Sequence, residues 1–472
     1  MMLRIFFLAA LCALAAWPQT AAHPDVTGAL GLLETWVARQ VAERELPGVA
    51  IGIVHGDALI WSKGFGYADM ERKTPITPKT QFRMASHTKV FTATALLQLR
   101  DAGKLQLDDP VSKYLPWFAV QGLPAEGPAV TIRHLITHSS GLPREAPGTL
   151  WTETSFPALE EVMRELPRQD TVFPPETRWK YSNLAFTLAG LIVEKVSGEP
   201  YAGYVQKHIL APLGMSDSRI TGSTPEPALA TPYRRREPGK DRETAPFTDC
   251  RAIAPAAALT STVEDMARFV AFQWKGGRVL KMPTLREMQR PHWVHPDWKS
   301  GWGLGFALRR DDDRLLAGHG GSVPGYRTQT WFSPAEQIGV VVLTNADDGN
   351  PAQFADQAIK LVFPVIRRTA AKPEPPGVPD PAWNRYTGTY QSPSSEFVIQ
   401  ISGSRLVMFD PSAPDVEPSV MRLVPVRPHV FRMESDRFTY GAIGELIQFE
   451  LDANGRVTRA RTPGGYAVRA NQ

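Results

Sequence analysis

A proline-rich stretch late in the chain limits what the whole sequence can fold into. The run KPEPPGVPDP, residues 372–381, places five prolines in ten residues. Proline lacks a backbone N–H and fixes φ, so neither a helix nor a central strand continues through such a run. We therefore expect an extended, semi-rigid linker at 364–381. It would divide the chain of 472 residues, too long for one typical core, into domains at 23–363 and 382–472.

The segment before this linker has strand patterns at both ends and helical patterns between them. Residues 49–67 alternate apolar with small or polar residues around a turn at 55–57, which is typical of a β-hairpin. Strand character returns at 327–332 and in the β-branched run 338–345, which suits a strand buried on both faces. Apolar positions three or four residues apart predict a helix that ends at Gly103 and helices at 131–138, 157–165, 183–197, 262–274 and 351–363.

This order of elements indicates an α+β domain. Strands at both ends of a helical middle imply that the ends of the domain meet in one sheet. We expect an antiparallel sheet flanked by helices, together with an all-helical region.

After the linker the pattern changes to short alternating segments separated by turns. They lie at 386–391, 397–401, 405–409, 429–433, 437–440, 446–451 and 456–461. This pattern predicts a small antiparallel β-barrel or sandwich, lipocalin-like, at 382–472.

Residues 1–22 have the features of a secretory signal peptide. Arg4 precedes an apolar stretch from Ile5 to Ala16, and small residues lead to Ala22. The apolar stretch is short of the roughly 20 residues that span a bilayer. We expect cleavage near Ala22, export to the periplasm or the medium, and no stable membrane insertion afterwards.

Charge and cysteine content argue against several classes of protein. The formal net charge is +4. The basic run Arg234–Arg236 and the acidic run Asp311–Asp313 have opposite charges, and we interpret both as solvated loops. Nucleic acid is therefore not expected as a partner. Without the leader Cys250 is the remaining cysteine, so an internal disulfide and a cysteine zinc site are excluded. No motif surrounds Cys250, and we interpret it as a buried thiol rather than a nucleophile.

Ser86 and Lys89 stand three residues apart at the start of an apolar helical pattern. In a helix this spacing places both side chains on one face. A serine hydroxyl is a poor nucleophile until a base takes its proton, and lysine serves as that base when its pKa is lowered. The pair is a catalytic candidate, although an ordinary helix start with a solvated lysine has the same spacing.

Two further motifs follow in a definite order. WKYSN, residues 179–183, supplies Tyr181 and Asn183 before an apolar helix, and GHGGSVPGY, residues 318–326, supplies His319 before the strand at 327. Ser-x-x-Lys, Tyr-x-Asn and a third motif that begins with Lys or His resemble the serine β-lactamase and penicillin-binding protein superfamily. The class C β-lactamase-like branch, with its DD-peptidases, D-aminopeptidases and esterases, is the most similar. TIRHLITHSSGLP, ILAPLGMSDS and LTSTVEDMARF extend the resemblance over roughly residues 28–360.

The resemblance implies a serine hydrolase that forms an acyl-enzyme and needs no metal or cofactor. Ser86 would be the nucleophile, Lys89 its base partner and Tyr181 a general base or acid, with the choice between Lys89 and Tyr181 as base left open. The implied substrate-binding residues are Asn183, His319, Gly320 and Gly321, and the implied oxyanion hole is formed by the backbone N–H groups of Ser86 and Ser322.

The substrate and the oligomeric state are left open by the resemblance. A small ester, amide or short peptide is expected. The alternatives are a DD-peptidase or D-aminopeptidase acting on peptidoglycan-type peptides, a β-lactamase, or a non-catalytic penicillin-binding sensor with the C-terminal domain as its interaction module. Gly320 lacks the hydroxyl that the family usually has there, and His319 would be mostly neutral at pH 7. Both features predict weak activity on penicillins and cephalosporins and better activity on short-chain esters or uncharged amides.

A possible metal pair is also present. His134 and His138 are four residues apart on a predicted helix, the spacing of a two-histidine metal face. The glutamate of H-E-x-x-H is missing, so we expect these histidines to be structural.

Overall fold

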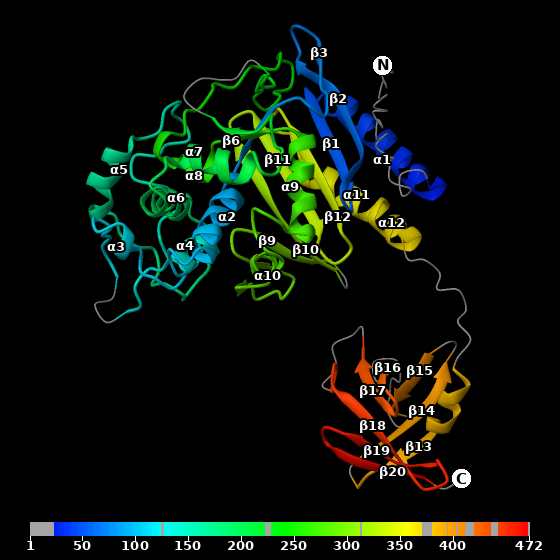
Figure 1. Ribbon diagram of the computed structural model, residues 1–472. Coiled ribbons are helices and arrows are strands. Elements are labelled where there is room, and N and C mark those ends of the chain that lie inside the picture. Colours follow the sequence, from blue (N-terminus) through cyan, green and yellow to red (C-terminus); the bar gives the residue numbers. More distant parts are fainter. Residues whose placement is uncertain are drawn as a thin grey trace, which may run out of the picture. The chain divides into compact units, whose positions relative to one another are not determined.

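The computed structural model describes residues 23–470 apart from 124–126, 222–227, 312–313, 371–379, 394, 403–404, 411–419 and 436–441. The predicted signal peptide at 1–22 therefore lies outside the described residues. The chain divides into two compact units, Met1–Ala370 and Ala371–Gln472, shown in Figure 1.

The N-terminal unit is built on a nine-stranded antiparallel sheet. Its strands have the order β3-β2-β1-β12-β11-β10-β9-β8-β7. Their bounds are β1 Gly48–His55, β2 Ala58–Asp69, β3 Thr74–Pro75, β7 Trp293–Val294, β8 Ser300–Trp302, β9 Ala307–Asp311, β10 Arg314–Val323, β11 Tyr326–Ser333 and β12 Ile338–Thr344. β1 pairs with β12, with Val49 opposite Thr344 and His55 opposite Ile338. The two ends of the unit thus meet in one sheet, as the sequence predicts.

Helices cover both faces of this sheet. α1 (Pro24–Glu43), α11 (Pro351–Leu361) and α12 (Phe363–Ala370) lie on one face, and α9 (Val263–Lys275) packs against β1 and β12 on the other (Figure 1). Val340 and Val342 of β12 belong to the core under α1 and α11, whereas Val341 belongs to the core under α9. Because side chains alternate along a strand, β12 is buried on both faces.

The last helix of this unit continues past the predicted start of the linker. α12 covers Phe363–Ala370, and its Phe363 and Ile366 are buried against α1 and α11. Pro364 stands in the first turn, where its missing N–H removes no helical hydrogen bond. The predicted linker therefore begins too early. Residues 371–379 of it lie outside the described residues.

The helical region surrounds α2 (Thr88–Asp101), which packs against α6 (Asn183–Ser197) and α8 (Ala254–Ala257). The other helices are α3 Val111–Tyr114, α4 Ile132–Thr137, α5 Leu159–Glu165, η1 Leu166–Arg168, α7 Tyr201–Val205, η2 Gln206–Leu210, η3 Arg251–Ile253 and α10 Met282–Met288. A second, three-stranded sheet has the order β4 (Phe82–Ala85), β6 (Leu259–Ser261) and β5 (Arg219–Ile220). The helices predicted at 131–138, 157–165, 183–197 and 262–274 are confirmed as α4, α5, α6 and α9.

The C-terminal unit is a closed antiparallel barrel of eight strands, so the barrel rather than the sandwich is correct. After η4 (Pro381–Tyr386) come β13 Gly388–Gln391, β14 Glu396–Ser402, β15 Arg405–Phe409, β16 Met421–Arg427, β17 Val430–Glu434, β18 Leu446–Leu451, β19 Val457–Thr462 and β20 Gly465–Arg469. The sequence patterns missed β16 and β20, and the strand predicted at 437–440 lies outside the described residues. Tyr390, Phe431 and Phe449 fill the barrel.

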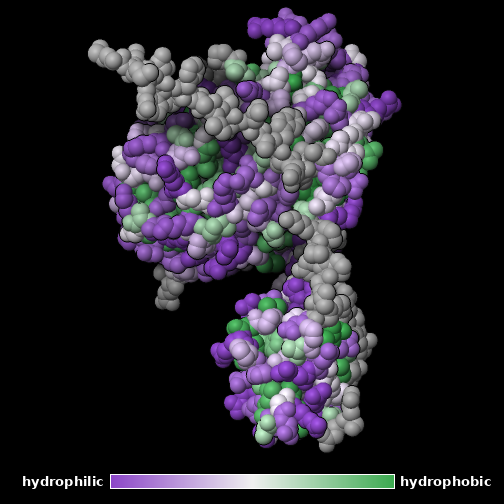
Figure 2. Space-filling model, turned by 45° about the vertical axis from the view of Figure 1, so that its right-hand side comes forward, coloured by the Kyte–Doolittle hydropathy of each residue, from purple (hydrophilic) through white to green (hydrophobic). Residues whose placement is uncertain are grey.

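The visible surface is mainly polar. Figure 2 shows hydrophilic residues over most of the face in view, with hydrophobic residues in small separate groups. In the described part of the chain, no helix combines the length and the hydropathy that crossing a bilayer requires.

Candidate active site

Ser86 lies at the junction between β4 and α2. The preceding residue, Ala85, has φ of 48°, in the left-handed region that alanine seldom adopts. The hydroxyl of Thr88 donates to the carbonyl oxygen of Ala85 at 2.6 Å and holds this turn. As a result Ser86 leaves the strand half-buried, on the wall of a cavity of about 1060 Å³.

Lys89 is fully buried in the first turn of α2. Its Nζ lies 3.2 Å from Oγ of Ser86, 2.7 Å from Oδ1 of Asn183 and 2.9 Å from the carbonyl oxygen of Ala256. Burial lowers the pKa of Lys89 to about 7, although the nearby carboxylate of Glu145 acts in the opposite direction. An amine with such a pKa is partly neutral at physiological pH, which is the form that accepts a proton.

Tyr181 approaches the same serine from another element. Its hydroxyl donates to Oγ of Ser86 at 2.9 Å. Burial raises the pKa of Tyr181 above its ordinary value, although the hydrogen bond to Ser86 and the nearby Arg144 guanidinium act in the opposite direction. Nζ of Lys89 lies 4.9 Å from the centre of the Tyr181 ring. The ring also packs on His138, with centroids 4.3 Å apart. Tyr181 is therefore held as a neutral phenol whose proton points at Ser86.

Asn183 begins α6 and is 3% exposed. Its Nδ2 donates to both carboxylate oxygens of Glu145, at 2.9 and 2.8 Å. A carboxylate only accepts hydrogen bonds, so these contacts turn Oδ1 of Asn183 toward Lys89. The two oxygens of the carboxylate lie close together and share one N–H of Nδ2. This arrangement positions Lys89, and because Asn183 also lines the cavity, the substrate-binding role stays a prediction.

Glu145 is a site residue that the sequence analysis missed. The loop that carries it is joined to the start of α6, because the N–H of Asn183 donates to the carbonyl oxygen of Arg144 at 2.6 Å and the hydroxyl of Ser182 donates to that of Pro143 at 2.6 Å. The Arg144 guanidinium donates to the Glu145 carboxylate at 3.1 Å. A charged residue in a loop carries no periodic signal, so only these long-range contacts reveal its place.

The third motif lies within β10 rather than just before the strand at 327. β10 pairs with β11, with His319 opposite Thr330 and Gly321 opposite Thr328. A Cβ at Gly321 would clash with the carbonyl oxygen of Met84 in β4. Only glycine therefore allows β10 to approach the strand that leads to the nucleophile.

His319 is buried and uncharged. Its Nδ1 lies 2.6 Å from the carbonyl oxygen of Gly320, which accepts only, so Nδ1 carries the hydrogen. Nε2 is then an acceptor, and it has no partner among the described residues. Burial, together with His87 and Lys89 nearby, lowers the pKa of His319 well below its ordinary value. This agrees with the expectation of a neutral histidine in the third motif.

The cavity brings the predicted residues together. Its lining includes Ser86, Tyr181, Asn183, His319, Gly320, Gly321 and Ser322. Lys89 is not part of the lining and lies beneath the cavity wall. Arg234 and Arg235 also line it, so the arginine run is more than a solvated loop. Trp151 and Trp179 add apolar surface.

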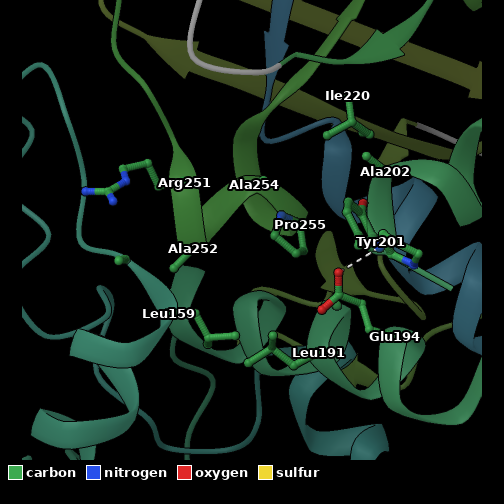
Figure 3. Close-up of a pocket in the computed structure, with 13 residues that line it drawn as sticks. Leu159, Leu191, Glu194, Tyr201, Ala202, Ile220, Arg251, Ala252, Ala254 and Pro255 are labelled. Atoms are coloured by element: carbon green, nitrogen blue, oxygen red, sulfur yellow. Dashed lines mark hydrogen bonds between the residues drawn. The ribbon is translucent and has the colours of Figure 1, made fainter. Parts of the chain in front are cut away.

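Helix α8 contains Ala256, whose carbonyl oxygen accepts from Nζ of Lys89. Its Pro255 carbonyl accepts from the hydroxyl of Thr92 at 2.7 Å, and that hydroxyl lies 2.7 Å from the hydroxyl of Tyr201. Figure 3 shows Pro255 and Tyr201 on the wall of a second cavity, of about 390 Å³, where Glu194 accepts from the N–H of Tyr201 at 2.7 Å. These contacts fix the carbonyl of Ala256 behind the catalytic cavity.

The two histidines with metal-like spacing have structural roles. Nδ1 of His134 accepts from the N–H of Thr131 at 3.1 Å, and its Nε2 lies 2.9 Å from Glu176. His138 ends α4 with φ of 58°, and its Nδ1 accepts from the N–H of Ser182 at 3.1 Å. No group of three His, Cys, Asp or Glu side chains in the described ranges is placed to hold a metal ion.

Cys250 is buried, as the sequence analysis expects. Its Sγ accepts a hydrogen bond from the guanidinium of Arg83 at 2.9 Å. Burial raises the pKa of the Cys250 thiol, so it remains protonated and unreactive.

Together the fold and the site define the β-lactamase/transpeptidase-like class of proteins. The Beta-lactamase family model matches residues 33–362, and the chain belongs to this family. Beta-lactamase-like protein 2 of Dictyostelium discoideum is 30% identical over 341 residues, which are 70% of this chain and 62% of that protein. Protein flp of Staphylococcus aureus (strain MW2) is 25% identical over 323 residues, 66% of this chain and 62% of that protein. The chain thus spans about 62% of the length of these relatives.

Two solved structures show the same fold. The octameric penicillin-binding protein homologue from Pyrococcus abyssi has a TM-score of 0.63 and 26% identity, and covers 93% of this chain and 100% of its own. The D-stereospecific amidohydrolase from Streptomyces sp. has a TM-score of 0.59 and 25% identity, and covers 71% of this chain and 98% of its own.

Proposed function

We propose that this protein is an exported serine hydrolase that cleaves an ester or amide bond through an acyl-enzyme on Ser86. The observation that carries the proposal is the position of Ser86 Oγ, within hydrogen-bond distance of both Lys89 Nζ and Tyr181 OH on the wall of a large cavity. Membership in the Beta-lactamase family and the similarity to an amidohydrolase support it.

In this proposal Lys89 is the base. A neutral amine has two hydrogens and one lone pair. The acceptors Asn183 Oδ1 and the Ala256 carbonyl have no hydrogen to give, so they take the two amine hydrogens. The lone pair then faces Ser86, whose hydroxyl donates to it. This arrangement suits a lysine whose pKa is lowered by burial.

The chemical steps follow from this arrangement. Ser86 Oγ attacks the carbonyl carbon while its proton passes to Lys89, and the electron pair of the C=O bond moves to oxygen. The backbone N–H groups of Ser86 and Ser322 would bind that oxyanion. When the bond to the leaving group breaks, Tyr181 protonates it and regains a proton from Lys89. Water then attacks the acyl group with Lys89 again as base, which releases the acid and restores Ser86.

Rates on a small panel of substrates test the proposal. p-Nitrophenyl acetate, p-nitrophenyl butyrate, nitrocefin and D-alanine p-nitroanilide are each given to the wild-type chain and to Ser86→Ala. We expect hydrolysis of at least one ester or amide, slower hydrolysis of nitrocefin because Gly320 has no hydroxyl, and background rates for the variant. Failure on every substrate would favour the non-catalytic sensor.

A second candidate is hydrolysis of amides of D-amino acids. It is favoured by the similarity to the D-stereospecific amidohydrolase, at 25% identity over 71% of this chain. Paired D- and L-alanine p-nitroanilides separate the two functions. A strong preference for the D isomer supports the amidase, and equal slow rates with fast ester hydrolysis support the esterase.

Export is the part of the proposal that rests on residues 1–22 alone. Production of the full chain in a Gram-negative host, followed by fractionation and N-terminal sequencing, tests it. We expect a periplasmic protein that begins at His23. An intact Met1 in the cytosolic fraction would contradict export.

A further inference from the structure

A second cavity, separate from the catalytic one, adjoins helix α8. Its volume is about 390 Å³, within the range of roughly 300 to 1,000 Å³ that is common for small-molecule sites. Residues of α6, α7 and α8 form much of its wall, and Figure 3 shows several of them around the space. The described linings of the two cavities have no residue in common. The second cavity is therefore a candidate binding site of its own.

The wall of this cavity is mainly apolar and firmly packed. Leu191, Ile220 and Ala254 are partly buried and pack against the main core. α6 and α8 are in close contact here, because a Cβ at Gly190 would clash with the ring of Pro255. Only glycine allows this approach of the two helices. A ligand with a hydrocarbon body would bury its surface against this wall without a rearrangement of the helices.

One carboxylate belongs to the wall and has no counter-ion. Glu194 of α6 is half-buried, and its carboxylate accepts from the N–H of Tyr201 at 2.7 Å, as Figure 3 shows. Within the part of the chain that the structure describes, no Lys, Arg or His side chain forms an ion pair with Glu194. A carboxylate can accept about four hydrogen bonds, so the contact with Tyr201 leaves positions for a ligand.

The other charged residue in the described lining does not balance Glu194. Nη1 of Arg251 donates to the carbonyl oxygen of Phe156 at 3.3 Å, and Figure 3 shows this guanidinium directed away from Glu194. The cavity therefore combines an apolar wall with a negative charge. An ammonium group complements that charge, because it has three N–H donors and its hydrogen bonds to a carboxylate are about twice as strong as those between neutral groups.

We propose that this cavity binds a small apolar amine as an ammonium ion. The ammonium pairs with the carboxylate of Glu194, and the hydrocarbon body lies against Leu191, Ile220 and Pro255. The rest of the wall is apolar, so the ligand has one charge at one end. The site does not rest on the proposed function. It does adjoin the helix that contains Ala256, whose carbonyl oxygen accepts from Lys89.

Isothermal titration calorimetry on the full chain tests the site with three probes that share a phenylalkyl body and differ in charge. They are 4-phenylbutylamine, which is protonated at neutral pH, 4-phenylbutanol and 4-phenylbutyrate. We expect saturable binding of the amine, weaker binding of the alcohol and the weakest binding of the acid. Glu194→Gln keeps an acceptor for Tyr201 but has no charge. It should lower the affinity for the amine by about 10- to 100-fold and leave that for the alcohol unchanged.

Two further variants locate the bound amine. Ala202→Trp places a large ring on an exposed residue of the lining and should weaken the binding of both the amine and the alcohol. Glu160→Gln, an exposed change on α5 outside the lining, is the control and should leave both affinities unchanged. Circular dichroism and the unfolding midpoint check that each variant is folded.

Three results would overturn the site. The first is a folded wild-type chain that shows no saturable binding of the amine, or that binds 4-phenylbutyrate equally well. The second is an affinity for the amine that survives both Glu194→Gln and Ala202→Trp, which would place the amine elsewhere. The third is an equal loss of affinity in Glu160→Gln, which would reduce the effect of Glu194 to general surface charge.

Discussion

Nζ of Lys89 lies 2.7 Å from Oδ1 of Asn183, and a third residue decides which amide atom Asn183 presents. The two oxygens of the Glu145 carboxylate accept from Nδ2, so the amide oxygen is turned toward the lysine. In this way a loop carboxylate controls the direction of the lysine lone pair. Glu145 acts through Asn183 and is a positioning residue.

The substitution Glu145→Gln tests this role. A glutamine offers an N–H as well as an oxygen, so it permits Asn183 to flip and to turn Nδ2 toward Lys89. We expect kcat to fall by roughly 10- to 100-fold with a small change in KM. The Glu145 charge also raises the pKa of Lys89, so the acid limb of the pH profile should move to lower pH. Glu165→Gln, a change on the surface, is the control. If the acid limb of the pH profile does not move in Glu145→Gln, Glu145 has only a structural role.

The pH dependence of kcat/KM should report Lys89. Its pKa is lowered to about 7, and the protonated ammonium that predominates below this pH has no lone pair to accept the proton of Ser86. Activity on p-nitrophenyl butyrate should therefore be lost as the pH falls through about 7. The pKa values of His138 and His319 are lowered well below their ordinary value, so these histidines do not account for the limb. A flat profile across this range would argue against Lys89 as the base.

Tyr181→Phe removes the hydroxyl that is assigned to protonate the leaving group. The ring and its contact with His138 remain, so the fold should persist. We expect amide hydrolysis to slow by at least ~100-fold. p-Nitrophenyl esters should slow less, because p-nitrophenolate leaves without a proton. The exposed Tyr67→Phe serves as control. An equal loss on both classes of substrate, or no loss on either, would contradict the assignment.

Two shortened chains test where the N-terminal unit ends. Residues 23–370 retain α12, whereas residues 23–362 lose Phe363 and Ile366 from the core. We expect the longer chain to fold and to react, and the shorter one to lose about 3 to 6 kcal/mol of unfolding free energy in urea titrations. An insoluble or unreactive chain 23–370 would show that the barrel completes the core or the site.

The sequence predicts the parts of this protein that local patterns encode. The hairpin 49–67, the strand 338–345 and six helices (α2, α4, α5, α6, α9 and α11) follow from periodicity, and Ser86 and Lys89 share a helix face because of their spacing. The sequence patterns miss β7 and β8 because these strands are very short, and they miss β9 and β10 because charged residues and glycines interrupt the alternation. The helix Pro24–Glu43 was missed as well, although its apolar residues recur at helical spacing.

The rest of the site depends on contacts between distant residues. The carbonyl of Ala256 has no side-chain signature, and Glu145 becomes a site residue only because its loop is joined to the start of α6. Arg234 and Arg235 looked like a solvated run because the cavity beside them is formed by β10 and the segment after β12.

Intact-mass spectrometry with a fluorophosphonate tests the central claim, that Ser86 is an activated nucleophile, most directly. The account predicts that the wild-type chain gains the mass of one phosphonyl group, and that a peptide map places it on Ser86. Ser86→Ala should remain unlabelled while its unfolding free energy stays within about 1 kcal/mol of wild type, since no large cavity opens. Labelling that persists in Ser86→Ala, or a folded wild-type chain that gains no mass, would contradict the account.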